Sequence, residues 1–234
     1  MTKARDIADS TATLNVDGGT IKLDGNYPTG SANVALGNVA LDDVGLTGAN
    51  NTAIGNNAAS ANTSGAENTI VGSSAFATNT TGGQNVAIGR SALNANTTAS
   101  NNTAVGYQAL TENTTGAANN AIGYNSQGAV TTGSGNVSVG VSALGLNTTG
   151  GQNVAIGNSA LYKNTAAGNT GVGNEAGYFV TSGTNNTVLG AYALKGTTDS
   201  TASSNTAIGT TVLTSNTTGT RNTGLGHNAL AANT

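Results

Sequence analysis

The sequence has no cysteine and no tryptophan, one proline, one histidine and two phenylalanines. Without cysteine, neither a disulfide framework nor a thiolate metal site can form, and the redox compartment cannot be read from the chain. Charged residues make up 7% of the chain, against about 25% in typical globular proteins. The net charge is −3 and the charges are scattered, so no basic patch offers a surface to nucleic acid.

Long apolar runs are missing as well. No segment approaches the roughly 20 apolar residues of a membrane helix, so we expect no membrane insertion. The opening residues Met1–Asp9 lack the apolar core of a signal peptide. We therefore expect a protein made in a cytoplasm and not exported by the Sec route.

Residues suited to catalysis are scarce. His227 lies on variable positions of the repeat described below, where a solvated side chain is the simplest interpretation. Asp42 and Asp43 are the only adjacent acidic pair, and Asp does not recur at a fixed phase as it does in calcium-binding rolls. No Gly-Lys-Ser/Thr phosphate loop is present. We therefore predict no catalytic residue, no metal site and no cofactor.

What the chain has in abundance is Asn, Thr, Gly and Ala in a fixed order. Residues Asn102–Leu110 read N-T-A-V-G-Y-Q-A-L, and near-copies follow one another at gaps of 17, 17, 17, 17, 17, 17, 16, 17, 19 and 17 residues. A fixed short period predicts a solenoid, in which each coil stacks on its neighbours. Disorder would give no reason for an aliphatic residue to recur at one phase. The copies open at Asn51, Asn68, Asn85, Asn102, Asn119, Asn136, Asn153, Asn169, Asn186, Asn205 and Asn222, with a fainter copy at Asn33.

We number each repeat from its opening Asn as position one. Aliphatic residues before an obligatory Gly predict a short strand that ends in a bend with positive φ. Successive strand residues point to opposite faces. We expect position four to point into the coil and the small residue at position three to face outward, where another backbone can approach closely. The repeat positions that represent the pattern are Asn102, Val105, Gly106, Leu110, Asn153, Ile156, Gly157 and Leu161.

A second turn signal, Asn-Thr-Thr-Gly, closes many repeats, for example at 113–116. One coil of about 17 residues is therefore a strand, a Gly bend, a short apolar segment and an Asn/Thr/Gly bend. Parallel strands stacked about 4.8 Å apart would make eleven coils a rod on the order of 50 Å long. The Asn column either forms an amide ladder along the axis or caps its own turns.

The first 50 residues differ from the rest, because they hold nine of the 17 charged residues. Within them, 14–16 and 21–23 alternate apolar and polar residues around a turn, which predicts a short β-hairpin. We place a boundary near 45–50, between an attachment or capping segment (1–50, with the faint repeat at 33–50) and a solenoid of eleven repeats (51–234). Ser126-Gln127 and Gly177 break the pattern, and the 19-residue repeat predicts a surface loop over 197–204.

The N-[TV]-A-[IV]-G-x-x-A-L repeats resemble two groups of proteins. One is the head of trimeric autotransporter adhesins, whose repeats read close to S-V-A-I-G-x-x-A. The other is the repeat-rich tail fibres of marine bacteriophages, which also have similar first residues. The resemblance covers roughly 33–234 and the first nine residues. It implies a left-handed parallel β-roll, all-β, assembled as a homotrimer on a surface fibre that contacts a host. We expect three chains to pack on the outward small-residue face, because Ala and Gly at position three permit close approach of backbones. A position-four column facing open water would contradict the whole account, both the stacking of the coils and the seam shared among three copies. Autotransporters also carry a secretion signal, a coiled-coil stalk and a membrane anchor, which this sequence does not show.

We therefore expect a structural fibre protein of a virion, on tail or capsid, joined to virion proteins through residues 1–50. The alternatives are an ice- or surface-binding solenoid, because Thr-Thr recurs once per coil, a bacterial surface adhesin head, and a polysaccharide depolymerase. Thr ranks are interrupted at 166–167, 182–183 and 198–199, and the body offers few acidic residues that could pair. A host-surface glycan could stack on exposed tyrosines; the alternative, which we prefer, is that they pack between coils or chains. The candidates are Tyr107, Tyr124, Tyr162 and Tyr192.

Overall fold

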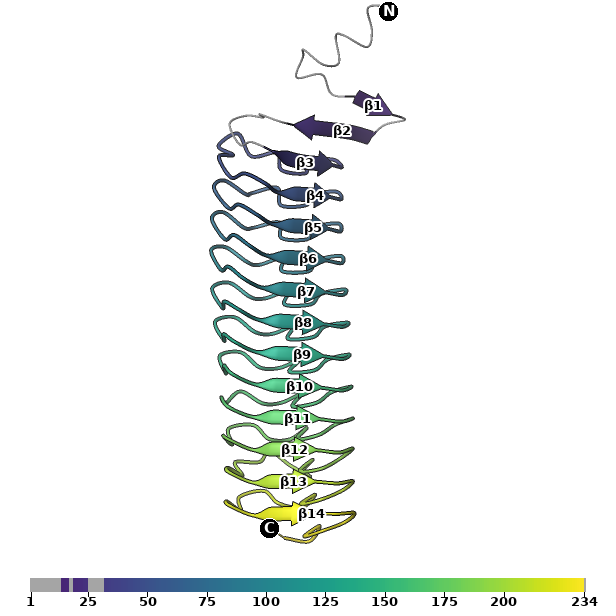
Figure 1. The fold of residues 1–234 in the computed structure, drawn as a ribbon, viewed down its shortest axis with the longest axis vertical. Coiled ribbons are helices and arrows are strands. Elements are labelled where there is room, and N and C mark those ends of the chain that lie inside the picture. Colours follow the sequence, from purple (N-terminus) through teal and green to yellow (C-terminus); the bar gives the residue numbers. More distant parts are fainter. Residues whose placement is uncertain (1–13, 17–18, 25–31, 234) are drawn as a thin grey trace, which may run out of the picture.

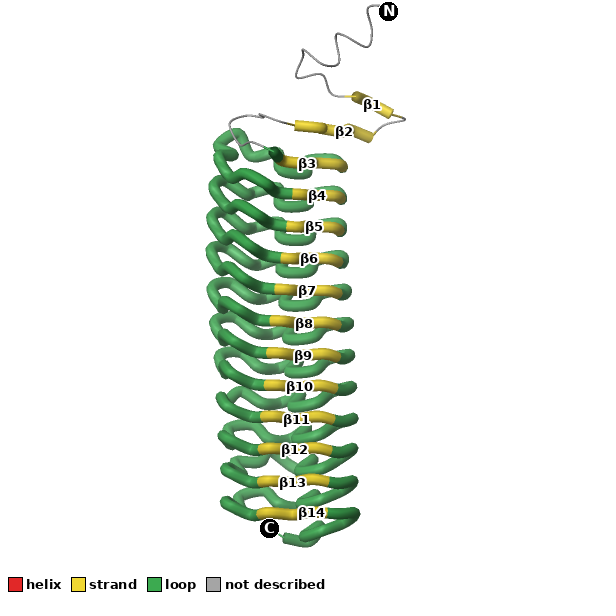
Figure 2. Tube along the Cα trace, in the orientation of Figure 1, coloured by secondary structure: helices red, strands yellow, loops and turns green. Residues whose placement is uncertain are grey.

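A computed structural model describes residues 14–16, 19–24 and 32–233, and their side chains from residue 32 onward. The described residues form one sheet of fourteen strands in chain order, joined by turns and without a helix (Figures 1 and 2). The strands are β1 (Leu14–Val16), β2 (Gly19–Asp24), β3 (Asn33–Leu36), β4 (Thr52–Ile54), β5 (Thr69–Val71), β6 (Val86–Ile88), β7 (Thr103–Val105), β8 (Asn120–Ile122), β9 (Val137–Val139), β10 (Val154–Ile156), β11 (Thr170–Val172), β12 (Thr187–Leu189), β13 (Thr206–Ile208) and β14 (Thr223–Leu225).

The sheet changes direction near its start. β1 and β2 pair antiparallel, at the two runs where the sequence predicts a hairpin, and β2 pairs antiparallel with β3. From β3 onward every pair is parallel and in register, so the fainter copy at Asn33 stacks as a coil like the others. The parallel part of the sheet thus begins upstream of the compositional boundary near 45–50. Residues 1–13, which include the opening segment of the predicted attachment region, lie outside the described residues.

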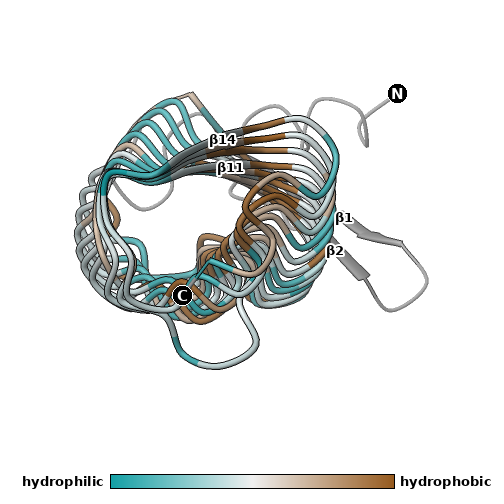
Figure 3. Ribbon diagram, turned by 90° about the horizontal axis from the view of Figure 1, so that it is seen from below, coloured by the Kyte–Doolittle hydropathy of each residue, from teal (hydrophilic) through white to brown (hydrophobic). Residues whose placement is uncertain are grey.

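The predicted parallel β-solenoid with coils of about 17 residues is confirmed. Eleven steps of about 4.8 Å separate β3 from β14, which makes a rod about 50 Å long. Viewed along its axis, the coils superpose, with the strands on one side and the returning segments on the other (Figure 3). The 19-residue coil keeps this register, because Thr187 on β12 still pairs with Thr206 on β13.

The predicted direction of the strand side chains is wrong. Position three is fully buried, as at Ala104, whereas position four is 44% exposed at Ile122 and 39% at Ile156. The aliphatic column therefore faces outward and the small residues face inward. The reason is the width of the interior. A Cβ added at Gly171, at position three, would lie 2.7 Å from Cγ of Leu161, at position nine of the preceding coil. The buried leucines thus fill the space that Ile or Val at position four would need.

The interior is built from a contact between position nine of one coil and position three of the next. Leu161 against Gly171 is one example, and the hydrogen bond from Gln127 Nε2 to Ser138 Oγ, at 2.8 Å, is another. The usual combination is Leu with Ala. Where position nine shrinks to Ala59, the next position three grows to Ile70, and both are buried. Gly177 and Val188 repeat this exchange, since the small residue at position nine is followed by a larger, buried one at position three of the next coil.

Position five requires glycine for two reasons. Its φ lies between 108° and 146° in all twelve coils, a region that residues with a Cβ rarely adopt. The neighbouring coil also passes close by, because a Cβ added at Gly106 would lie 2.4 Å from the carbonyl oxygen of Gly123. Gly157 has the same conformation, with φ of 131°. The Gly column thus lets the coils stack at strand spacing where the chain turns.

The loop predicted over 197–204 is shorter in the structure. Residues 197–199 are exposed, but Ser200 is buried and forms a parallel bridge with Val180. Ser200 rejoins the stack because its backbone N–H donates to the Phe179 carbonyl at 2.7 Å. Three residues therefore accommodate the extra length of this coil.

Candidate functional site

The Asn column runs through the interior of the rod as a continuous ladder. The backbone N–H of each position-one Asn, from Asn51 to Asn222, donates to Oδ1 of the Asn one coil earlier, over 2.8–3.0 Å. The same side chains cap local turns: Asn153 Nδ2 donates to the Ala166 carbonyl at 2.9 Å. Both structural interpretations of the column thus hold together. Asn102 and Asn153 are fully buried, so their polar atoms are closed to a ligand. Asn102 Nδ2 is the one amide group of this pair that has no hydrogen-bond partner.

A second buried Asn column lies at the Asn-Thr-Thr-Gly turn, and sequence reasoning read it only as a turn signal. Asn79 Nδ2 donates to the Gly82 carbonyl at 3.1 Å and to Asn62 Oδ1, one coil earlier, at 2.7 Å. The repeat of Asn at position twelve was the signal that could have revealed this column. The column is broken at Val130 and Val180, which occupy that position in their coils. An Asn at position 130 would donate to Asn113 Oδ1, but Val130 has no side-chain donor, so this oxygen has no partner.

The first Thr of most turns forms a column of hydrogen bonds along the rod. Its hydroxyl donates to the Thr carbonyl of the next coil, for example from Thr80 to Thr97 at 3.1 Å. The column runs from Thr63 to the Thr148 carbonyl, and Thr165 and Thr181 make the same bond in later coils. No such bond joins Thr148 to Thr165, so the column has a gap next to the coil where an interruption at 166–167 was predicted. The second Thr of the turn is exposed in five consecutive coils. These residues are Thr81, Thr98, Thr115, Thr132 and Thr149.

The outward side chains at positions two and four of β3–β14 form a surface that we call the strand-face stripe. Position two carries mostly Thr or Val, and position four carries Ile, Val or Leu; Val105 is partly buried and Leu189 is 47% exposed. Three strand residues are about 10 Å wide, and the rod is about 50 Å long, so the stripe covers on the order of 500 Å². Apolar patches on monomeric proteins reach a similar area, but Thr or Asn at eight of the twelve position-two sites makes part of the stripe polar.

The four candidate tyrosines do not gather in one place. Tyr107 and Tyr124, at position six, stack with ring centroids 5.4 Å apart, and Arg90 lies over the Tyr107 ring. They follow the Gly bend directly and border the strand-face stripe. Tyr192, at position seven, lies under the ammonium group of Lys195. Tyr162, at position ten on the returning segment, stacks instead on Tyr178, with centroids 5.1 Å apart. The neighbouring-coil packing expected of tyrosines is seen in both stacks.

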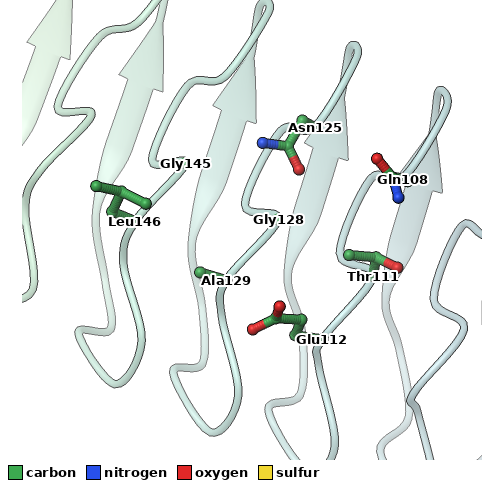
Figure 4. A pocket seen from close by; sticks show the side chains of 8 residues that line it. All are labelled: Gln108, Thr111, Glu112, Asn125, Gly128, Ala129, Gly145 and Leu146. Carbon is green, nitrogen blue, oxygen red and sulfur yellow. The ribbon is translucent and has the colours of Figure 1, made fainter.

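A groove of about 290 Å³ lies on the returning segment (Figure 4). It opens where Gly128 and Gly145 occupy position ten in consecutive coils, between Thr111 and Tyr162 in the coils on either side. A Cβ added at Gly145 would lie 2.7 Å from Cε2 of Tyr162, so the Tyr162 ring lies directly against one end of the groove. The lining residues are Gln108, Thr111, Glu112, Asn125, Gly128, Ala129, Gly145 and Leu146.

The acidic residues of the solenoid are spread over different coils and positions. Glu175 pairs with Lys195 at 2.7 Å, and Asp199 pairs with Lys163 at 3.0 Å. Among the described residues, no three His, Cys, Asp or Glu side chains lie close enough to hold a metal ion. His227 is exposed, and its Nε2 lies 3.0 Å from the Asn228 amide. None of the described residues forms a helix that is long and apolar enough to cross a membrane.

Comparisons with protein-family models, with curated proteins and with solved structures found no match to this chain. The strand-face stripe and the groove therefore carry the functional argument. They lie on opposite sides of the interior, because position three on the strand and position nine on the returning segment face each other across it.

Proposed function

We propose that the chain is a structural fibre protein of a virion, a rigid spacer that associates as a homotrimer and attaches to a host surface. The observation that carries the proposal is the strand-face stripe, in which Ile, Val or Leu stands at position four of every coil and is partly or largely exposed along the rod. The trimer, the left-handed winding and the attachment through residues 1–50 come from the resemblance of the repeats. The stripe replaces the small-residue face as the expected seam, because the small residues fill the interior.

A shared seam would bury side chains that a single rod leaves in contact with water. β-branched residues at most of positions two and four make this face similar from coil to coil. The exceptions are Asn120, Leu36, Leu189 and Leu225. Three copies related by an axis along the rod can match these side chains along their whole length. Apolar surface of this extent drives association in proportion to its area.

The rod form supports a mechanical role. The strand ladder and the Asn columns bond each coil to its two neighbours, which is how repeat proteins make long, stiff shapes. The buried polar groups of this stack are almost all satisfied: among the described side chains, three buried polar atoms lack a hydrogen bond, namely Asn102 Nδ2, Asn113 Oδ1 and Gln127 Oε1. A stack of this kind resists local opening because its backbone and side-chain bonds support each other.

Analytical ultracentrifugation of the purified chain tests the assembly. We expect a species of three times the chain mass of 22.5 kDa at micromolar concentration. A well-folded monomer under these conditions would contradict the trimer. Electron microscopy of the source particle, with an antibody against the solenoid, tests the virion location.

Ice or surface binding is a second candidate, because five exposed threonines stand in one rank from Thr81 to Thr149. The adjacent rank weakens it, since those hydroxyls already donate to the next coil's carbonyl groups, as Thr97 does to Thr114 at 3.2 Å. A thermal hysteresis assay on the purified chain separates the two functions, and we expect no hysteresis.

A further inference from the structure

We propose that the groove around Gly128 and Gly145 binds an extended neutral glycan, with one pyranose ring in the groove and the next against the stacked rings of Tyr162 and Tyr178. The inference rests on the proposed role in host attachment for its biological meaning and assigns that role to a site.

The groove is a departure from the repeat. Other coils carry a side chain at position ten, such as Thr111 and Tyr162, whereas two consecutive coils carry Gly. The gap spans about two rungs, or roughly 10 Å along the rod. Its volume of about 290 Å³ is at the lower limit of sites that hold small ligands. A single sugar ring, with the chain continuing along the axis, matches this size and direction.

The polar lining offers unused hydrogen-bonding groups. The side chains of Gln108, Glu112 and Asn125 line the groove (Figure 4), and none of them makes a hydrogen bond or ion pair with another described residue. Two amides supply donors and acceptors, and a carboxylate supplies acceptors. Neighbouring hydroxyl groups of a pyranose each donate and accept, so they can replace the water that solvates these three side chains.

The aromatic end of the groove is held in place before any ligand arrives. Tyr178 stacks on Tyr162, and Phe179 meets Tyr178 edge-on with centroids 4.7 Å apart. Lys163 lies 4.6 Å from the centre of the Phe179 ring and is anchored by Asp199. A ring surface that is already ordered loses little entropy on binding. The C–H face of a pyranose packs on such a surface while its hydroxyl groups stay in water.

The negative charge of the groove determines which class of glycan it can bind. Glu112 is the only charged residue among those that line the groove, and the nearby cations Lys163 and Lys195 are already paired with Asp199 and Glu175. A uronate or sulfated sugar would meet the Glu112 carboxylate without a compensating cation. The groove therefore favours neutral sugars. Because it lies on the side opposite the strands, a trimer that uses the strand-face stripe leaves three grooves open, and a polymer that spans them gains avidity.

The test uses the full chain with cellohexaose and chitohexaose as neutral β-linked probes and hexagalacturonate as the anionic one. Isothermal titration calorimetry measures binding, and tyrosine fluorescence reports on the aromatic end, since the chain has no tryptophan. We expect a neutral probe to bind and hexagalacturonate to bind about tenfold more weakly, with the Glu112→Gln variant reducing that difference.

Two variants test the location. Gly128→Thr fills the groove with a residue that position ten already accepts at Thr111. Its Cβ would displace only the end of the Asn125 side chain, whereas a side chain at Gly145 would push the Tyr162 ring itself. We expect binding to fall beyond detection. Ser60→Thr, at position ten of a distant coil, is the matched control and should bind like the parent. Tyr162→Ala should weaken binding about tenfold through the lost ring contact. Circular dichroism and sedimentation must stay unchanged in each variant used for comparison.

Failure of the parent chain to bind either neutral probe would overturn the inference, and so would full binding by the filled variant. Both results leave the trimer and the fibre role standing if the parent sediments at three times the chain mass. A folded monomer that binds a neutral probe, and loses it on filling the groove, would overturn the proposed trimer and support this site.

Discussion

Two aspartates on the strand-face stripe should separate the chains. Ile122 and Ile156 are 44% and 39% exposed in the single rod, so the proposed seam would bury roughly two-fifths of each side chain. Full burial of an Ile side chain is worth about 1.5–3 kcal/mol, and two-fifths of that is about 1 kcal/mol. Twelve position-four residues from β3 to β14 then contribute about 10 kcal/mol per chain, or about 30 kcal/mol per trimer.

Ile122→Asp with Ile156→Asp would place six carboxylates in the seam of a trimer, two from each chain. Each ion that loses its water without a partner costs several kcal/mol, so the total penalty is on the order of 20 kcal/mol or more. Joining two further chains already costs about 4–15 kcal/mol each in lost freedom. The variant should therefore sediment as a monomer at micromolar concentration, where the parent sediments as a trimer.

The matched control carries Thr115→Asp and Thr149→Asp, which add the same charge at exposed positions of the Asn/Thr/Gly turn. It should remain trimeric. Circular dichroism must show that both variants keep the parent's β-sheet signal. A doubly substituted stripe that still sediments at three times the chain mass would refute the assignment of the seam, as would dissociation of the control.

Three further predictions concern the stack itself. Asn136→Ala removes the acceptor of the next coil's backbone N–H and the donor to a turn carbonyl; it should lower the free energy of unfolding by about 2–5 kcal/mol in guanidinium titrations, while Asn158→Ala at an exposed site changes it by less than about 0.5 kcal/mol. Gln127→Leu, with Ala in place of Ser126 and Ser138 beside it, restores the apolar interior. It should raise the free energy of unfolding by about 1–3 kcal/mol, because a buried side-chain oxygen without a partner is removed. A lower midpoint in the guanidinium titration would contradict this. Ala59→Leu and Ile70→Ala should each destabilise by about 1–4 kcal/mol and the double variant by less than their sum, whereas additivity would mean that the two residues do not share one space.

The sequence predicted the features that depend on period. Strand positions, the Gly bend and the Asn column all followed from recurrence at a fixed phase, and each lies where it was expected. These are properties that neighbouring coils share, so eleven copies reinforce one another. The second Asn column was within reach by the same logic, but the turn signal at that position concealed it.

Which side chains of the strand face the interior could not be obtained in this way. Alternation shows that positions three and four point to opposite sides, but it does not say which side is the interior. General hydrophobicity favoured Ile156 as the buried residue and Ala155 as the exposed one, and the structure reverses them. The signal that would have corrected this is the exchange of volume between Ala59 and Ile70, and between Gly177 and Val188, because only inward-facing residues need to compensate each other.

The groove was also beyond sequence reasoning. It depends on two glycines whose significance is the absence of a side chain, in a sequence with 35 glycines. Only the register of the coils brings Gly128, Gly145 and the Tyr162 ring together. The tyrosines themselves were found by their type, but their separation onto two sides of the rod required coordinates.

Because the coils stack in register, the length of the rod is set by the number of coils and changes in equal steps. Because position nine of each coil meets position three of the next, excising one whole period, such as 102–118, would join two compatible neighbours and shorten the rod by one step of about 4.8 Å. Duplicating a period would lengthen it by the same amount. Gene duplication and deletion can therefore adjust how far such a protein reaches, one rung at a time, without redesigning its interior.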